Sequence, residues 1–267
     1  MEASRDENKA VIVDLTPLFV YVRDSYLSSA DSLQATLRNR GPGPRDWPLV
    51  FTENPAVQPK VVFEAKLQRP TSVLAGMIID RWQDDHHKAY VAEEDGTIHI
   101  IDASTLMARW SWQKIGPLAE LGSFKVGRNP VSMVFTRFGS SPLPLLPLKN
   151  NGKQQPPEPL NNTFYVACRG DREIDAVVVW EGKGQVYRRI KDSRMGDPVA
   201  VSVASRGNIV SVADFNGRKV LSFRIGGISD RYGVHYGAGA DGNADFEFAG
   251  ELPVAGHPFA VNSANVN

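Results

Sequence analysis

The sequence predicts an all-β fold: a β-propeller or partial propeller of about four blades, with long loop insertions. Three observations lead to this prediction. Residues 195–225 have the pattern of consecutive strands joined by tight turns. Weaker copies of that stretch occur elsewhere in the chain, and the prolines that open the copies are regularly spaced.

The clearest stretch begins with Gly196-Asp197-Pro198, a turn signal in which proline, lacking an N–H, suits the first residue of a strand. Residues 199–204 are mostly small and β-branched, as in a strand buried on both faces, and residues 209–213 follow as a second strand. Asn216-Gly217 is a strong hairpin signal, because both residues tolerate positive φ. Residues 219–225 alternate in polarity, which predicts a half-buried third strand.

Openings of this kind occur at Pro70, Pro130, Pro198 and Pro258, which are 60, 68 and 60 residues apart. A compact blade has about 40–50 residues, so the spacing requires inserted loops. The second and third strands of the earlier copies are expected at 88–92 and 97–102, and at 163–167 and 176–180. We therefore expect a single propeller domain or fragment over 1–267, with blades near 61–113, 123–190, 195–250, and 257–267 with 1–23, and insertions near 24–60, 139–162 and 226–249.

The N-terminal residues fit the same pattern from the middle of a copy. Residues 3–8 resemble the end of a second strand and its turn, and residues 9–15 a third strand. Residues 16–23 are apolar and are expected to form an outer strand, as are 61–67 and 108–113. Residues 25–37 have loosely spaced leucines that indicate a short helix within the first insertion.

The repeated pattern is Gly-x-x-Pro, an apolar strand, Tyr-Val-Ala, a short polar turn and a strand ending in Asp. With Tyr90-Val91-Ala92 and Tyr165-Val166-Ala167, it resembles the YVTN-type β-propeller repeat of the lactonase-like and surface-layer-like propellers. The resemblance covers roughly 69–113, 123–190, 195–225 and the two chain ends, and it implies blades arranged in a ring. The third copy departs from it with Ser211-Val212, and no copy has the family's Thr-Asn after Tyr-Val.

Composition excludes several function classes. The chain has 30 basic and 30 acidic residues and no net charge, so no nucleic-acid partner is expected, nor an anionic membrane surface. Cys168 is the single cysteine, which excludes an internal disulfide and a multi-cysteine metal site. No apolar run approaches about 18 residues, so no membrane span is predicted.

Two interpretations of the extent of the chain stay open. In one, the chain is an excerpt of a longer propeller, and it would be exported to the periplasm or outside the cell if that longer protein is secreted. In the other, residues 258–265 complete the blade begun by residues 1–15 and close a small ring, and the protein would be cytoplasmic. Closure would remove the exposed sheet edges that otherwise promote aggregation.

Propeller geometry predicts where a site would lie. The turns that precede the inner strands and those that follow the middle strands lie on the same face of the ring. The candidate residues for binding a protein partner or a small polar ligand there are Arg69, Arg128, Arg169, Asp171, Asp197, Asp214 and His257, because arginines and carboxylates can recognise polar or anionic groups. The alternative is that these residues satisfy the turn backbones and pair with one another.

No catalytic residue is predicted, since the chain has no Gly-x-Ser-x-Gly turn, no phosphate-binding glycine motif and no haem-attachment motif. The expected function is a non-catalytic binding scaffold. The alternatives are a propeller enzyme, either a lactonase-like hydrolase or a redox-associated domain, and a structural repeat of a large surface protein. No cofactor is predicted, although the closely spaced oxygens of Asp241, Asn243 and Asp245 make calcium an alternative to a solvated loop.

Overall fold

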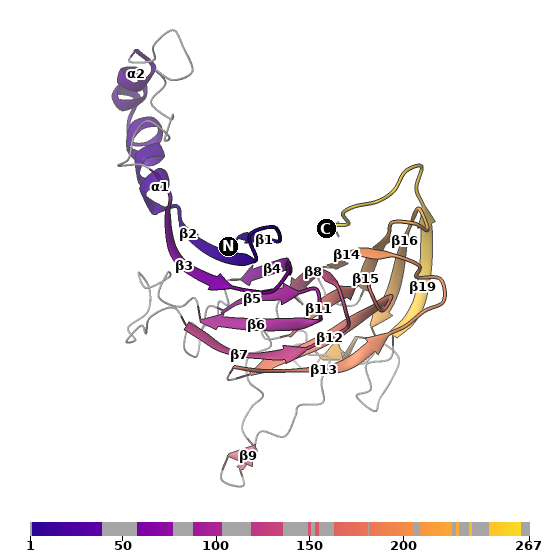
Figure 1. Ribbon diagram of the computed structural model, residues 1–267. Coiled ribbons are helices and arrows are strands. Elements are labelled where there is room, and N and C mark those ends of the chain that lie inside the picture. Colours follow the sequence, from indigo (N-terminus) through magenta and orange to yellow (C-terminus); the bar gives the residue numbers. More distant parts are fainter. Residues whose placement is uncertain are drawn as a thin grey trace.

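The structure of the protein is a computed structural model. It describes residues 2–38, 58–76, 88–102, 119–135, 149–150, 153–154, 163–180, 182–204, 209–225, 228–229, 235–236 and 246–262. Four antiparallel sheets follow one another along the chain (Figure 1). The first sheet comprises β1 (Glu2–Ser4), β2 (Lys9–Asp14) and β3 (Lys60–Lys66). The second comprises β4 (Pro70–Gly76), β5 (Lys88–Glu93), β6 (Thr97–Asp102) and β7 (Ala119–Lys125).

The third and fourth sheets repeat the layout of the second. The third comprises β8 (Pro130–Phe135), β11 (Thr163–Cys168), β12 (Glu173–Trp180) and β13 (Lys183–Ile190). The fourth comprises β14 (Pro198–Val203), β15 (Ile209–Asp214), β16 (Lys219–Ile225) and β19 (Phe246–Pro253). Two short hairpins, β9 (Lys149–Asn150) with β10 (Lys153–Gln154) and β17 (Ile228–Ser229) with β18 (His235–Tyr236), lie within insertions.

The sheets are arranged as successive blades along an open arc (Figure 1). The innermost strands β4, β8 and β14 contact one another in sequence, and the outermost strands β7 and β13 are also in contact. The first and fourth sheets lie at the two ends of the arc, and no closed ring is formed by the described residues. The closed four-blade ring is therefore not confirmed.

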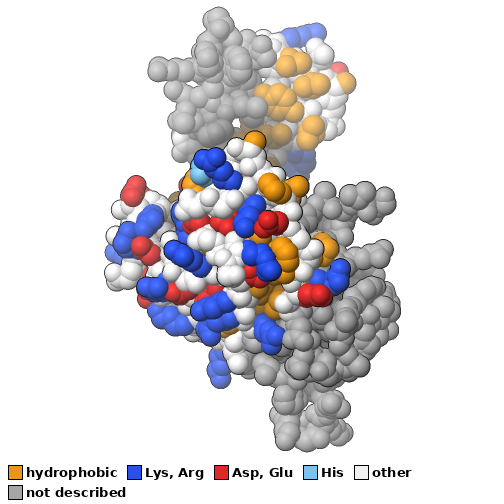
Figure 2. Space-filling model, turned by 90° about the vertical axis from the view of Figure 1, so that its right-hand side faces the viewer, with side chains coloured by type: hydrophobic (Ala, Val, Ile, Leu, Met, Phe, Trp, Pro, Cys, Tyr) orange, Lys and Arg blue, Asp and Glu red, His pale blue; other side chains and the backbone are white. Residues whose placement is uncertain are grey.

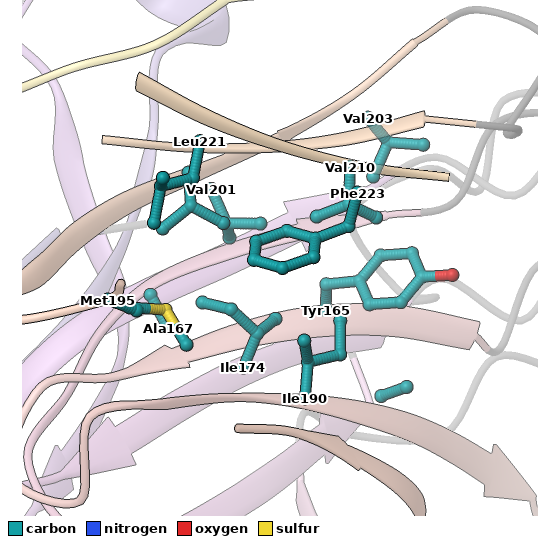
Figure 3. Close-up of a cluster of buried hydrophobic side chains, with 12 residues drawn as sticks. Tyr165, Ala167, Ile174, Ile190, Met195, Val201, Val203, Val210, Leu221 and Phe223 are labelled. Atoms are coloured by element: carbon teal, nitrogen blue, oxygen red, sulfur yellow. The ribbon is translucent and has the colours of Figure 1, made fainter. Parts of the chain in front are cut away.

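A separate hydrophobic cluster fills each boundary between successive sheets. Tyr165, Ile174, Val201, Leu221 and Phe223 belong to the cluster between the third and fourth sheets (Figure 3). The other two clusters lie between the second and third sheets and between the first and second. Each boundary buries apolar surface on both sides, and this burial stabilises the stacking of the sheets.

Strand β11 shows why the sequence of a middle strand is apolar throughout. Successive side chains of a strand point to opposite faces, so Phe164 and Val166 pack toward the second sheet while Tyr165 and Ala167 pack toward the fourth. All four are fully buried. A continuous apolar run is thus the pattern expected of a strand that is covered on both faces.

Most of the strand predictions are confirmed. The expected second and third strands of the three complete copies are β5, β6, β11, β12, β15 and β16, and the inner strands begin at Pro70, Pro130 and Pro198 as expected. The expected strands at 9–15 and 61–67 are β2 and β3. The short helix expected at 25–37 is also present, as η1 (Arg23–Leu27) followed by α2 (Ala30–Arg38).

The outer strand predicted at residues 16–23 is wrong, because this segment forms helix α1 (Thr16–Val22). Asp14 accepts a hydrogen bond from the Thr16 N–H at 2.8 Å, and Pro17 lies at the start of the helix, where its fixed φ is favourable. The helices project from the first sheet and leave the outer position to β3, which pairs with β2 (Figure 1).

The predicted blade limits also need correction. Since β3 belongs to the first sheet, the second begins at Pro70 rather than near 61, and it ends at Lys125 rather than near 113. The insertion expected at 226–249 overlaps β19, whose first residue is Phe246. The outer strand predicted at 108–113 lies outside the described residues.

The opening at Pro258 begins no strand among the described residues, since 254–262 are irregular. A strand requires a partner, and the described residues that follow Pro258 form no ladder with β1 or with any other strand. Among the described residues, no helix has the length and apolar character needed to cross a membrane.

Candidate functional site: the turn face

The turns that open the inner strands lie against the turns that join the second and third strands. In the second sheet the Glu94 N–H donates to the Arg69 carbonyl at 2.9 Å. The same backbone hydrogen bond recurs in the next two sheets. In the third sheet the Arg169 N–H donates to the Asn129 carbonyl at 3.0 Å, and in the fourth the Phe215 N–H donates to the Asp197 carbonyl at 2.9 Å. The two kinds of turn therefore form one surface, which we call the turn face.

In the second, third and fourth sheets, a carboxylate lies beneath the turn that opens the inner strand and accepts hydrogen bonds from backbone N–H groups of that turn. Asp214 accepts from Gly196 at 3.0 Å, from Asp197 at 2.8 Å and from Gly217 at 3.1 Å, and it is fully buried. Glu93 accepts from Gln68 at 2.6 Å in the second sheet. Asp214, predicted as a ligand-binding residue, thus stabilises the turn backbone from within the fold.

In the third sheet Cys168 occupies the position of Glu93 and Asp214 at the end of the middle strand. Asp175, on the neighbouring strand β12, accepts the Gly127 N–H at 2.8 Å instead. Burial raises the pKa of Asp175 to about 6, and the nearby Glu173 carboxylate adds to the rise. Sequence reasoning missed this residue, although a carboxylate inside the apolar run 174–180 was a signal for it.

Cys168 itself is not a reactive group in the fold. Its side chain is fully buried, and burial raises the pKa of its thiol, with further rises from Asp175 and Glu173. The thiolate needed for nucleophilic attack or metal binding is therefore disfavoured at this position.

The predicted arginines and acids of the turn face meet in pairs. Arg169 donates from Nε and from a terminal nitrogen to both oxygens of Asp197, at 2.5 and 2.9 Å, across the boundary between the third and fourth sheets. Arg128 donates its backbone N–H and its Nε to Asp171 at 2.7 and 2.9 Å, and these bonds hold the pKa of Asp171 below its usual value.

The remaining two predicted residues lie at the ends of the series. Arg69 and Arg5 both approach one oxygen of Glu94, at 2.7 and 2.9 Å, and so join the first sheet to the second. The His257 ring stacks on Phe215 at 4.5 Å between centroids, and its Nδ1 lies 2.8 Å from the Phe215 carbonyl oxygen. Phe215 was not predicted as a site residue, and its place after Asp214 in the turn was the only signal.

Within each pair the cation is the more accessible partner. The exposed fraction of the side chain is 71% for Arg128 and 26% for Asp171, and it is 42% for Arg169 and 7% for Asp197. A guanidinium has five N–H donors in a planar fork, so an arginine held by one carboxylate can still recognise another polar or anionic group.

The calcium candidates Asp241, Asn243 and Asp245 lie outside the described residues. Among the residues that the structure describes, no three His, Cys, Asp or Glu side chains are grouped so as to hold a metal ion.

No family model matches the chain, and no curated protein matches it. Solved structures to which it is similar include a periplasmic gluconolactonase of Pseudomonas aeruginosa, with 14% identity and a TM-score of 0.41 over 71% of this chain and 41% of that chain. A protein from Lactobacillus plantarum has 13% identity and a TM-score of 0.46, over 77% of this chain and 48% of that chain.

A β-propeller domain of Myceliophteria thermophila has 11% identity and a TM-score of 0.38, over 73% of this chain and 47% of that chain. The chain spans less than half the length of each of these three structures. At such identities and TM-scores the likeness carries no argument about function, and the blade arrangement rests on the sheets described above.

Proposed function

We propose that the protein is a non-catalytic propeller scaffold that binds a protein partner or a small polar ligand at the turn face. The observation that carries the proposal is the hydrogen bond that recurs between the two kinds of turn in three successive sheets. Together with the bond from the Gly170 N–H to the Arg128 carbonyl, this bond supports a common surface for Arg69, Arg128 and Arg169. Each of the three is held by a carboxylate that is less exposed than the arginine itself. Side chains fixed in this way lose less conformational entropy when they bind a partner.

The test uses the double variant Arg69→Ala/Arg128→Ala. These side chains are 57% and 71% exposed, and neither contacts a fully buried carboxylate, so their loss is expected to leave the fold intact. The matched control is Arg23→Ala/Arg38→Ala, which removes the same charge from the exposed helices. Thermal unfolding of each variant checks the fold.

In an affinity capture from the native source, the wild type and the control are expected to retain the same partner and the turn-face variant to lose it. Small ligands are screened in parallel by the shift in unfolding temperature of the same three proteins. A partner or ligand retained equally by all three would rule out the turn face as the binding surface.

A lactonase-like hydrolase or a redox-associated domain is the alternative. Metal analysis of the purified chain, with a chelator-sensitive activity screen on lactones and esters, separates it from the scaffold. Turnover that is abolished by the chelator would overturn the non-catalytic proposal.

A further inference from the structure

Residues 258–262 have the sequence of an inner strand, but they pair with no strand among the described residues. In each inner strand a small residue follows two positions after the opening proline: Ser72 in β4, Ser132 in β8 and Ala200 in β14. Ala260 stands at the same distance from Pro258. The segment therefore has the pattern of a further inner strand without a sheet to join.

The backbone in front of this segment already lies as it does in front of an inner strand. The Val254 N–H donates to the Arg218 carbonyl at 2.9 Å, and the Val126 N–H donates to the Gly96 carbonyl at the same distance ahead of β8. Beyond this docked opening, the side chain of Phe259 is 75% exposed. The fold thus places the segment at the open side of the fourth sheet and leaves its apolar side chains facing water, which is unfavourable.

The first sheet lacks the strand that this segment would provide. Its order is β1-β2-β3, and no strand of the described residues lies on the other side of β1. In the other three sheets that position, beside the middle strand, is held by β4, β8 and β14. One end of the arc therefore has a middle strand with a free edge, and the other end has an inner strand without a partner.

A repeated register fits these two segments to each other. In three sheets the small residue after the opening proline lies opposite an alanine of the middle strand: Ser72 opposite Ala92, Ser132 opposite Ala167 and Ala200 opposite Ala213. Each of these alanines is the last residue but one of its strand, and Ala3 holds this place in β1. The same register sets Ala260 opposite Ala3.

Within one chain these segments lie at opposite ends of the open arc (Figure 1). Three buried clusters fix the inclination of the sheets, and closing the arc on itself would disrupt the close packing of all three. Two copies related by a two-fold axis can instead join end to end. With four sheets in each chain, such a ring lies at the upper end of the range of about 4 to 8 blades.

The outward faces of the two end sheets also expose apolar side chains. Val61 is 60% exposed and lies opposite Val13, on the face of the first sheet that is turned away from the second. Leu252 is 64% exposed and lies opposite Val220, on the face of the fourth sheet that is turned away from the third. Figure 2, a view from the side of β19, shows hydrophobic side chains among the charged ones at this end. Contact between the end sheets of two copies would bury such side chains.

We propose that two copies of the chain form a closed ring in which residues 258–262 of each copy pair with β1 of the other. The pairing satisfies the backbone groups at both free edges, which otherwise promote unspecific association. The inference does not rest on the function proposed for the turn face.

The test mixes equal amounts of two single variants, Ala3→Cys and Ala260→Cys, under mild oxidation. Residues opposite each other in antiparallel strands have Cα atoms about 4.5–5.5 Å apart, within the range that a disulfide spans. The matched control mixes Ala3→Cys with Ala255→Cys, an exposed position of the same segment that the register does not set opposite Ala3. Cys168, which is fully buried, is kept in every variant.

We expect the first mixture to give a disulfide between positions 3 and 260 of two chains, located by peptide mass mapping, and the control mixture to give at least about tenfold less. Light scattering of the wild type should give the mass of two chains. Equal cross-linking in both mixtures, or a wild-type mass of one chain, would overturn the proposal. A disulfide within one chain of the double variant Ala3→Cys/Ala260→Cys would overturn it in favour of closure of a single chain.

A second variant disrupts the pairing. Ala260→Arg places a long charged side chain where the equivalent residues are serine or alanine, and it is expected to give the mass of one chain, whereas Ala255→Arg remains a pair. A pair that persists in Ala260→Arg would contradict the register. Arg69 and Arg128 lie outside both paired segments, so the turn-face variant is expected to remain a pair and the two proposals can fail separately.

Discussion

Arg169 and Asp197 join the third sheet to the fourth by two hydrogen bonds, although the aspartate is almost buried and the arginine is not. This asymmetry predicts unequal mutational effects. Arg169→Ala leaves a buried carboxylate without its cation and is expected to lower the free energy of unfolding by about 1–3 kcal/mol. Asp197→Ala is expected to cost less, because the exposed guanidinium regains water.

Urea unfolding of both single variants and of the double variant measures the difference. The double variant should be about as stable as Asp197→Ala alone, since the penalty of the unpaired carboxylate disappears with it. Single-site effects that are equal and add up in the double variant would contradict this account of the pair.

Gly127 lies where no side chain fits. A Cβ there would lie 2.6 Å from a Glu173 oxygen and 2.8 Å from the Cys168 Cβ, both in a packed interior. We expect Gly127→Ala to destabilise the fold by about 1–3 kcal/mol through overpacking. Gly256→Ala is the matched control in another opening, because a Cβ there would have no neighbour within 4 Å. If the two substitutions shift the unfolding midpoint equally, close packing at Gly127 is not the cause.

Asp175 predicts a pH dependence of stability. Its pKa rises to about 6 in the fold from an ordinary value of 3.8, so the folded state binds more protons than the unfolded state between these values. The stability due to this group is therefore present below about pH 4 and is lost as pH rises through about 6, to the extent of about 2–3 kcal/mol.

The comparison with Asp175→Asn isolates this effect, because asparagine keeps an oxygen for the Gly127 N–H and does not titrate. The wild type should lose stability relative to the variant when urea unfolding is measured from pH 4 to pH 7. Parallel stability curves over this range would show that Asp175 does not carry the shift.

Cys168 provides a probe of opening at the boundary between the second and third sheets. It is the only cysteine of the chain, and it is fully buried with a raised thiol pKa. We expect no labelling by a thiol reagent in the folded protein at pH 8 and one label per chain in denaturant. Rapid labelling under native conditions would mean that the third sheet separates readily from its neighbour.

The sequence allowed the strands to be predicted because their signals are local. Proline marks the openings at 70, 130 and 198, and apolar runs mark the strands buried on both faces. The apolar segment 16–23 misled the prediction, since a short run without clear periodicity suits either a helix or a strand. Strand β7, which contains Glu120 and Gly122, has no such signal and was missed.

The turn face could be predicted because the same turns recur, so equivalent positions had to lie together. The role of Asp175 could not be predicted from the sequence. It depends on the strand register that sets Val166 opposite Asp175, and on Cys168 occupying the position that Glu93 and Asp214 hold in the other sheets. The burial of Glu173 depends likewise on tertiary packing. Charge counts along the chain give no sign of it.

Contacts with Phe215 hold residues 257–259 against the fourth sheet. Its ring stacks on His257 and meets Phe259 edge-on at 4.7 Å, and the Val254 N–H donates to the Arg218 carbonyl at 2.9 Å. Equivalent backbone hydrogen bonds are made just before the openings of the second and third sheets: the Leu67 N–H donates to the Asn8 carbonyl, and the Val126 N–H donates to the Gly96 carbonyl. Residues 254–258 therefore pack against the fourth sheet as the other openings pack against theirs, although no strand follows among the described residues.

We expect Phe215→Ala to release this segment, so that amide exchange at residues 257–262 becomes faster while exchange in β15 and β16 is unchanged. Phe259→Ala, which removes only the outer ring contact, should have a smaller effect, because the His257 stack and the bond to the Phe215 carbonyl persist. If exchange in the segment is as slow in Phe215→Ala as in the wild type, the backbone bond from Val254 is sufficient to hold it.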